Sequence, residues 1–334
     1  MRRRNFLSSA ALALTGMAGC SREKPAEPSA AANSPGDGKA GEIKTGGSRM
    51  IPIDGGKYRV WTKRVGRGDI KVLTLHGGPG ASHEYFECFE DFLPQNGIEF
   101  YYYDQLDSFN SDHPDDPKLW TMERFTDEVE QVRSALGLEN FILYGQSWGG
   151  MLAIEYALKY PRHLRSVVIS NMVASIPAYL KRVNEIRKAF PPETVRVMEK
   201  YEAKKQYEAP EYQKVIFEEL YTKYLCRAVP WPEPVERTFR HLNQKIYNYM
   251  QGPNEFVVTG TFKDWDRTAD LKNIKTRALL MSAKYDEMDA DEIRRMAASM
   301  PNARAVISDK GSHLTMWDDQ DWYFRELIPF LKES

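Results

Sequence analysis

The sequence predicts an α/β fold in which helices flank a mostly parallel sheet. Over most of the 334 residues, short apolar runs alternate with stretches of helical periodicity. One junction between the two is the pentapeptide Gly-Gln-Ser-Trp-Gly at 145–149, which follows the apolar run 141–144. A serine flanked by glycines two positions away on either side is typical of a nucleophile elbow. Larger side chains there would collide with the sharp turn from strand to helix.

Seven apolar runs are expected to form the strands of this sheet: 58–65, 70–75, 98–103, 141–144, 166–170, 277–282 and 303–307. The clearest helix starts at Thr121 and stops at Gly137. Its apolar residues recur every three or four positions and therefore line one face: Phe125, Val129, Val132 and Leu136. A second helix runs from the elbow through Tyr160 and ends before Pro161.

The alternation of strands and helices stops between residues 171 and 264. This segment contains long charged and aromatic helical stretches, at 179–190, 193–207 and 211–226, and no convincing strand. We therefore divide the folded body into a core, residues 49–170 and 265–334, and an inserted helical cap, residues 171–264. Ligands of open parallel sheets lie at the carboxyl ends of the strands, so a cap across that edge would shape the pocket and exclude water.

The first 20 residues have the composition of an export signal, with arginines at 2–4, a mostly apolar run at 6–18 and small residues before Cys20. The segment resembles a bacterial lipoprotein signal, in which Cys20 would be lipidated and become the new N-terminus. The alternative is cleavage beside a free cysteine. The resemblance implies a lipoprotein of the bacterial cell envelope that faces the periplasm. Both the export route, twin-arginine or general, and the membrane that receives the anchor stay open.

Residues 21–48 are rich in Pro, Ala, Gly, Ser, Lys and Glu, and we expect them to form a flexible linker. The formal charge of −1 argues against a nucleic-acid partner, and membrane contact is expected only through Cys20. Cys88 and Cys226 have no metal-ligand spacing; they could form one disulfide or remain two buried thiols. Neither a metal nor a cofactor is expected, and the oligomeric state stays open.

A second glycine-rich motif, His-Gly-Gly-Pro-Gly at 76–80, follows the expected strand 70–75. Enzymes with a nucleophile elbow place here a loop that supplies one backbone donor of the oxyanion hole. We assign the two donors to the N–H groups of Gly78 and Trp148, the latter directly after the elbow serine. The alternative for this loop is a tight turn without a catalytic role.

A serine nucleophile needs a base, and the base needs an acid that orients it. Ser147 is the nucleophile, and His313 is the candidate base because it follows the last expected strand and precedes the final helix. Asp286 follows the strand 277–282 and completes the chain order Ser, Asp, His of this fold. Asp289 and Asp291 are competitors, but they lie where a helix starts and are also explained as N-terminal helix charges.

The chain resembles the proline iminopeptidase family of α/β hydrolases, serine aminopeptidases that remove an N-terminal residue, preferentially proline. The resemblance rests on seven segments: 76–80, 103–105, 145–150, 252–256, 263–265, 285–287 and 312–317. It is strongest to the tricorn-interacting aminopeptidases and implies the α/β-hydrolase fold. It also implies that Glu255 and Glu287 bind the free amino group of a short peptide or amino acid amide.

One segment departs from the family. After residues 103–105 the family usually continues with glycines at alternate positions, whereas this chain has Leu-Asp-Ser-Phe-Asn-Ser at 106–111. We expect a bulkier, more polar loop near the pocket mouth that affects the preferred substrate size.

Two other functions stay open at this point. An amino acid amidase or esterase of the same fold would use the same catalytic residues. A non-catalytic binding lipoprotein would not require them. Epoxide hydrolases and dehalogenases are excluded because they need a carboxylate at the elbow, where this chain has Ser147.

Overall fold

The computed structural model describes residues 46–334. The predicted signal segment, the lipidation site at Cys20 and nearly all of the predicted linker lie outside the described residues, so they stay predictions. A strand already starts at Ser48, one residue before the expected start of the core. Among residues 46–334, no helix has both the length and the apolar composition that a membrane span requires.

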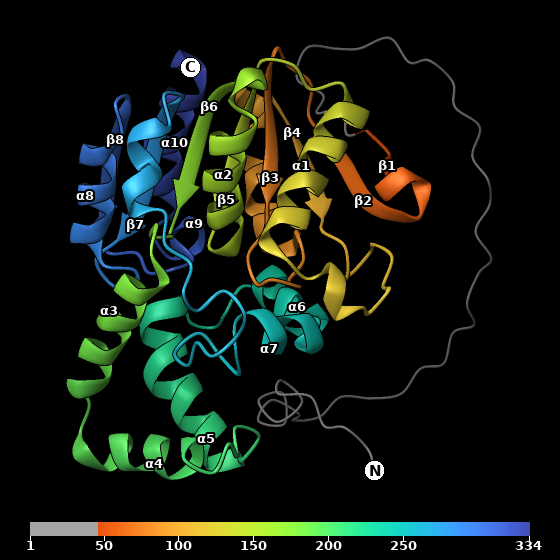
Figure 1. Cartoon of the computed structure of the whole chain (residues 1–334). Coiled ribbons are helices and arrows are strands. Elements are labelled where there is room, and N and C mark those ends of the chain that lie inside the picture. The colour runs from red at the N-terminus through yellow and green to blue at the C-terminus, as the bar shows by residue number, and fades with distance from the viewer. Residues whose placement is uncertain (1–45) are drawn as a thin grey trace, which may run out of the picture.

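A single sheet of eight strands runs through the core, in the order β1-β2-β4-β3-β5-β6-β7-β8 (Figure 1). Strands β1 and β2 pair antiparallel with each other, and β2 with β4, whereas all other neighbours are parallel. The strands are β1 (Ser48–Ile53), β2 (Tyr58–Val65), β3 (Ile70–Leu75), β4 (Ile98–Asp104), β5 (Phe141–Gln146), β6 (Leu164–Ser170), β7 (Arg277–Ala283) and β8 (Ala303–Ser308). The predicted α/β-hydrolase fold is confirmed.

All seven expected strands are present, and β1 is the strand that we did not expect. Its sequence contains Pro52, which lowers the strand signal because proline cannot donate a ladder hydrogen bond. The strand is tolerated because it lies at the edge of the sheet.

The core helices are α1 (Met122–Leu136), α2 (Trp148–Lys159), α8 (Ala290–Ser299), α9 (Thr315–Asp318) and α10 (Gln320–Glu333). Helix α1 begins and ends where expected: the Thr121 side chain caps its first turn, and Gly137 adopts φ 65° at its end. Figure 1 shows α1 and α2 in front of the sheet. The 3-10 helix η3 (Glu84–Asp91) and α10 meet through aromatic contacts, with Phe89 and Phe324 ring centres 5.3 Å apart.

The cap consists of α3 (Ile176–Lys188), α4 (Pro192–Glu202), α5 (Pro210–Val215), the π-helix η7 (Ile216–Leu225), α6 (Glu233–His241) and α7 (Gln244–Met250). It lies below the carboxyl ends of the parallel strands (Figure 1). The chain enters and leaves the cap side by side, because the Ile176 N–H donates to the Trp265 carbonyl and the Arg267 N–H to the Ala174 carbonyl. The stretch 211–226, expected as one regular helix, changes from α to π geometry after Val215.

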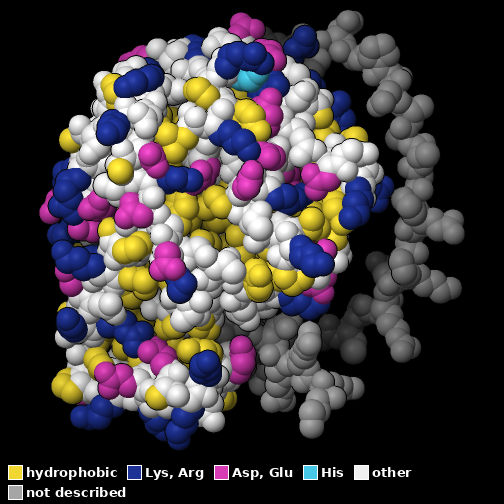
Figure 2. Space-filling model, in the orientation of Figure 1, with side chains coloured by type: hydrophobic (Ala, Val, Ile, Leu, Met, Phe, Trp, Pro, Cys, Tyr) yellow, Lys and Arg dark blue, Asp and Glu magenta, His cyan; other side chains and the backbone are white. Residues whose placement is uncertain are grey.

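Charged side chains of both signs share the surface. Figure 2 shows basic and acidic side chains interspersed over the described part of this face, in keeping with the near-zero net charge.

Cys88 and Cys226 are both free and buried, and burial raises the pKa of each thiol. Of the two possibilities left open by the sequence, the structure shows two buried thiols.

Candidate active site

The elbow serine occupies a strained turn between β5 and α2. Ser147 has φ 57° and ψ −127°, and the helix starts at the next residue. A Cβ on Gly145 would lie 2.0 Å from the carbonyl oxygen of Gly149, and a Cβ on Gly149 would lie 2.0 Å from that of Leu75. The glycine spacing read from the sequence is therefore a steric requirement of this turn.

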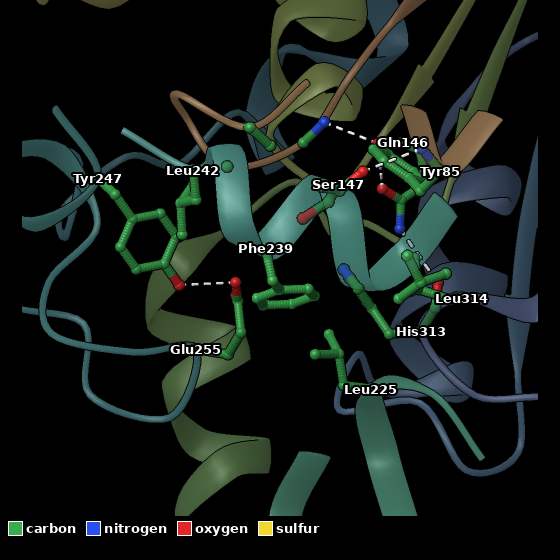
Figure 3. Close-up of a pocket in the computed structure, with 15 residues that line it drawn as sticks. Tyr85, Gln146, Ser147, Leu225, Phe239, Leu242, Tyr247, Glu255, His313 and Leu314 are labelled. Carbon is green, nitrogen blue, oxygen red and sulfur yellow. Dashed lines mark hydrogen bonds between the residues drawn. The ribbon is translucent and has the colours of Figure 1, made fainter. Parts of the chain in front are cut away.

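Ser147 lies at a pocket of about 50 Å³ between the core and the cap. Ser147 and His313 point toward one another from opposite walls, with Glu255 of the cap on a further side (Figure 3). The structure thus brings together a residue from the end of β5, one from the loop after β8 and one from the insertion.

The two predicted backbone donors lie beside the serine. Gly78 and Trp148 border a second, smaller pocket that also contacts Ser147. The Trp148 N–H belongs to the first turn of α2 and has no acceptor within its helix. Gly78 adopts φ 108°, and a Cβ there would lie 2.7 Å from the backbone nitrogen of Ala81. This position therefore needs glycine, as a backbone that approaches an oxyanion closely does.

His313 and Asp286 form a hydrogen-bonded pair. The distance from His313 Nδ1 to Asp286 Oδ1 is 3.0 Å, and both side chains are buried. Three further donors reach the carboxylate: Asn171 Nδ2 at 2.7 Å, Ser282 Oγ at 2.9 Å and the Met288 N–H at 3.0 Å. These four donors satisfy both oxygens of the buried carboxylate. The competitor Asp289 caps helix α8 by accepting from the Asp291 N–H, as the alternative assignment anticipated.

The cap itself holds the loop that carries the histidine. The N–H groups of His313 and Leu314 donate to the carbonyl oxygens of Tyr224 and Leu225, at 2.9 and 2.8 Å. Both acceptors lie in the last turn of the π-helix, where carbonyl groups have no partner within the helix. From the core side, Gln146 Nε2 donates to the His313 carbonyl at 3.1 Å. The position of His313 therefore depends on both the core and the cap.

Two more carboxylates lie close to this histidine. Glu287 is fully buried, and its Oε1 lies 3.2 Å from His313 Nδ1. Neither oxygen of Glu287 has a hydrogen-bond partner among the described residues. Glu255 accepts a hydrogen bond from the Tyr247 hydroxyl at 2.6 Å (Figure 3). Burial raises the pKa of both glutamates, and for Glu287 the neighbouring Asp286 and Glu255 carboxylates raise it further.

These carboxylates control the protonation of His313. Burial alone would lower its pKa, but Glu287, Asp286 and Glu255 outweigh this effect and raise it to about 10. The carboxylates around the imidazole therefore favour its protonated form in the free site.

Asp286, Glu287 and His313 also form a group whose donor atoms all lie within 4.8 Å, close enough to hold a metal ion. The geometry favours another use of these atoms. The Nδ1 atom of His313 faces Asp286, and Asp286 already accepts from three other groups. A serine nucleophile with a histidine base needs no metal, so we assign this group to catalysis and substrate binding.

Several supporting residues were missed in the sequence. Asn171 and Ser282 lie at the ends of β6 and β7, and the rule that sites form at the carboxyl ends of parallel strands could have found them. Tyr247 and Phe239 come from cap helices, and no local signal marks them. His76 is a structural residue: its Nε2 accepts from the Gln105 N–H, and burial lowers its pKa to about 4.

The loop at 106–111 contacts the cap, and its expected effect on substrate size stays a prediction. Among the described residues, none of these six lines either pocket at Ser147. Phe109 instead stacks on His241 of the cap, with ring centres 3.9 Å apart, and the Asp107 carbonyl accepts from Asn243 Nδ2. The loop therefore supports the cap through the Phe109 ring, which reaches α6, and through the Asp107 carbonyl.

The fold and site define a serine hydrolase of the α/β-hydrolase type. The model of the family described as "alpha/beta hydrolase fold" matches residues 71–320. The proline iminopeptidase of Flavobacterium johnsoniae is 44% identical over 290 residues, which are 85% of this chain and 98% of that protein. That of Saccharolobus solfataricus is 35% identical over 272 residues, covering 81% and 87%.

Two solved structures agree with this assignment. The proline iminopeptidase of Mycobacterium smegmatis superimposes with a TM-score of 0.79 at 30% identity, over 86% of this chain and 98% of that one. The structure of VinJ gives a TM-score of 0.83, also at 30% identity, over 87% and 99%. The chain belongs to the proline iminopeptidase family of α/β hydrolases.

Proposed function

We propose that the protein releases the N-terminal residue, preferentially proline, from short peptides and amino acid amides. Ser147 attacks the carbonyl carbon of the first residue while His313 accepts the hydroxyl proton. Asp286 holds the imidazole and stabilises its positive charge. The N–H groups of Gly78 and Trp148 bind the oxyanion, a contribution of about 3 kcal/mol per donor. His313 then protonates the leaving amine, and water hydrolyses the acyl-enzyme.

The observation that carries this proposal is the pair of glutamates near His313, the candidate base. An aminopeptidase must recognise a free ammonium group one residue from the scissile bond. Glu255 contacts the same pocket as Ser147, and Glu287 has two buried oxygens without a hydrogen-bond partner among the described residues. Buried carboxyl oxygens that accept no hydrogen bond are costly unless a ligand donates to them. A substrate ammonium would supply charge-assisted hydrogen bonds to both.

The test compares prolyl β-naphthylamide with its N-acetylated analogue, using protein that starts near residue 49. We expect hydrolysis of the free amine and at least about 100-fold lower kcat/KM for the acetylated compound, because acetylation removes the charge. Glu255→Gln and Glu287→Gln should reduce this difference, and Glu326→Gln on α10 is the control. Equal hydrolysis of both compounds would instead leave a general amidase or esterase.

The same carboxylates predict a pH dependence. Hydrolysis requires neutral His313, so the rate should rise with pH as this residue loses its proton. Glu287→Gln removes a carboxylate that raises the pKa of His313, so the acidic limb of kcat/KM should move to lower pH. p-Nitrophenyl acetate is the suitable substrate because it carries no amino group that titrates. An acidic limb that stays in place, or moves to higher pH, would contradict this account of His313.

A further inference from the structure

The two pockets at Ser147 correspond to the two sides of the scissile bond. The leaving amine must lie near His313, which protonates it, and His313 lines the larger pocket but not the smaller one. The smaller pocket contains Trp148 and the methionines Met151, Met172 and Met288. Glu255 contacts both pockets, as a group that binds the amine of the first residue would. The larger pocket is therefore the leaving-group side and receives the second residue of the substrate.

One wall of the leaving-group pocket is apolar and comes mostly from the cap. Helix α6 and the residue after it turn one face toward the pocket, with Val235, Phe239 and Leu242 spaced three or four positions apart. Leu225 of the π-helix and Leu314 beside the histidine complete this wall (Figure 3). Phe239 and Leu242 are only partly buried, so a substrate side chain could cover the rest of their surface.

The pocket offers no positive side chain for a carboxylate. Among the described residues that line it there is no lysine or arginine, and its acidic side chain is Glu255. Arg237 of α6 is held away by Glu84 and Glu87, at 2.9 and 2.5 Å. The guanidinium of Arg227 lies over the ring of Tyr285, 3.8 Å from its centre. A carboxylate in this pocket would lose water and meet another negative charge.

Building on the proposed function, we propose that the protein selects substrates by their second residue as well as their first. It prefers an apolar second residue whose carboxyl group is an amide, as in longer peptides, and it discriminates against an acidic second residue and against free dipeptides. Phe239 and Leu242 are the residues that determine this specificity.

The experiment measures kcat/KM for three compounds with the same first residue: Pro-Leu-amide, Pro-Glu-amide and the free dipeptide Pro-Leu. We expect Pro-Leu-amide to exceed each of the other two by about 10-fold or more, as expected when a buried group is left uncompensated. Equal values for all three would overturn the inference while the proposed function stands. Failure to cleave any of them, or prolyl β-naphthylamide, would overturn both.

A charge introduced into the wall provides an independent test. Phe239→Arg places a cation in the pocket and should narrow the difference between Pro-Leu-amide and free Pro-Leu by about 5-fold or more. Glu236→Arg adds the same side chain to the exposed face of α6 and should leave the ratio unchanged. If the ratio of kcat/KM for Pro-Leu-amide to that for free Pro-Leu is the same in Phe239→Arg and Glu236→Arg, Phe239 does not determine this specificity. If Phe239→Arg does not fold, the three compounds with the unmodified protein still decide the question.

Discussion

Ser147→Ala is expected to lower kcat for prolyl β-naphthylamide by at least about 10⁴-fold without changing the fold. The Oγ atom is the only atom lost, and alanine meets the same steric limits as serine at φ 57°. The loss is large because the acyl-enzyme cannot form without the Oγ atom. The residual rate reflects binding and the oxyanion hole alone.

Two measurements check the serine prediction. A fluorophosphonate probe should label the unmodified protein and not the variant, and the melting temperatures of the two should agree. Ser299→Ala, on the exposed end of α8, is the matched control and should retain full activity and labelling. A variant that keeps a substantial part of the activity would show that Ser147 is not the nucleophile.

Asp286→Asn is expected to lower kcat by about 10⁴-fold. Every neighbour of this carboxylate donates: Asn171 and Ser282 to Oδ2, and Met288 N–H and His313 Nδ1 to Oδ1. An amide nitrogen in either position would therefore face a donor. If it faces His313, the imidazole is held in the wrong tautomer for accepting the serine proton.

Asp289→Asn is the control for this second prediction. Asp289 is three residues away and caps α8, a role that asparagine also fills, so activity and stability should be retained. Steady-state kinetics with prolyl β-naphthylamide make the comparison. Comparable losses of activity in Asp286→Asn and Asp289→Asn would mean that Asp286 is not the aspartate that orients His313.

Much of the core could be predicted from the sequence because its signals are local. Buried parallel strands require continuous apolar runs, and the elbow requires glycines on either side of Ser147. Strand β1 escaped prediction because Pro52 is acceptable only at a sheet edge, and edge position is not visible in a short segment. The contact between the loop at 106–111 and the cap could not be predicted because its partner, His241, lies far away in the sequence.

At the site, too, some features follow from local sequence signals and others from contacts between distant segments. The sequence by itself determined the fold class and placed Ser147, Asp286 and His313 after three strands of one sheet. It could do so because the steric limits of the elbow act over a few residues and because the order of the strands follows from the topology. Only the tertiary structure decided how Glu255 and Glu287 come together around His313 and how α6 presents Phe239 to the pocket. These relations depend on how the cap packs over the sheet, and that packing is the sum of many weak apolar contacts between distant segments.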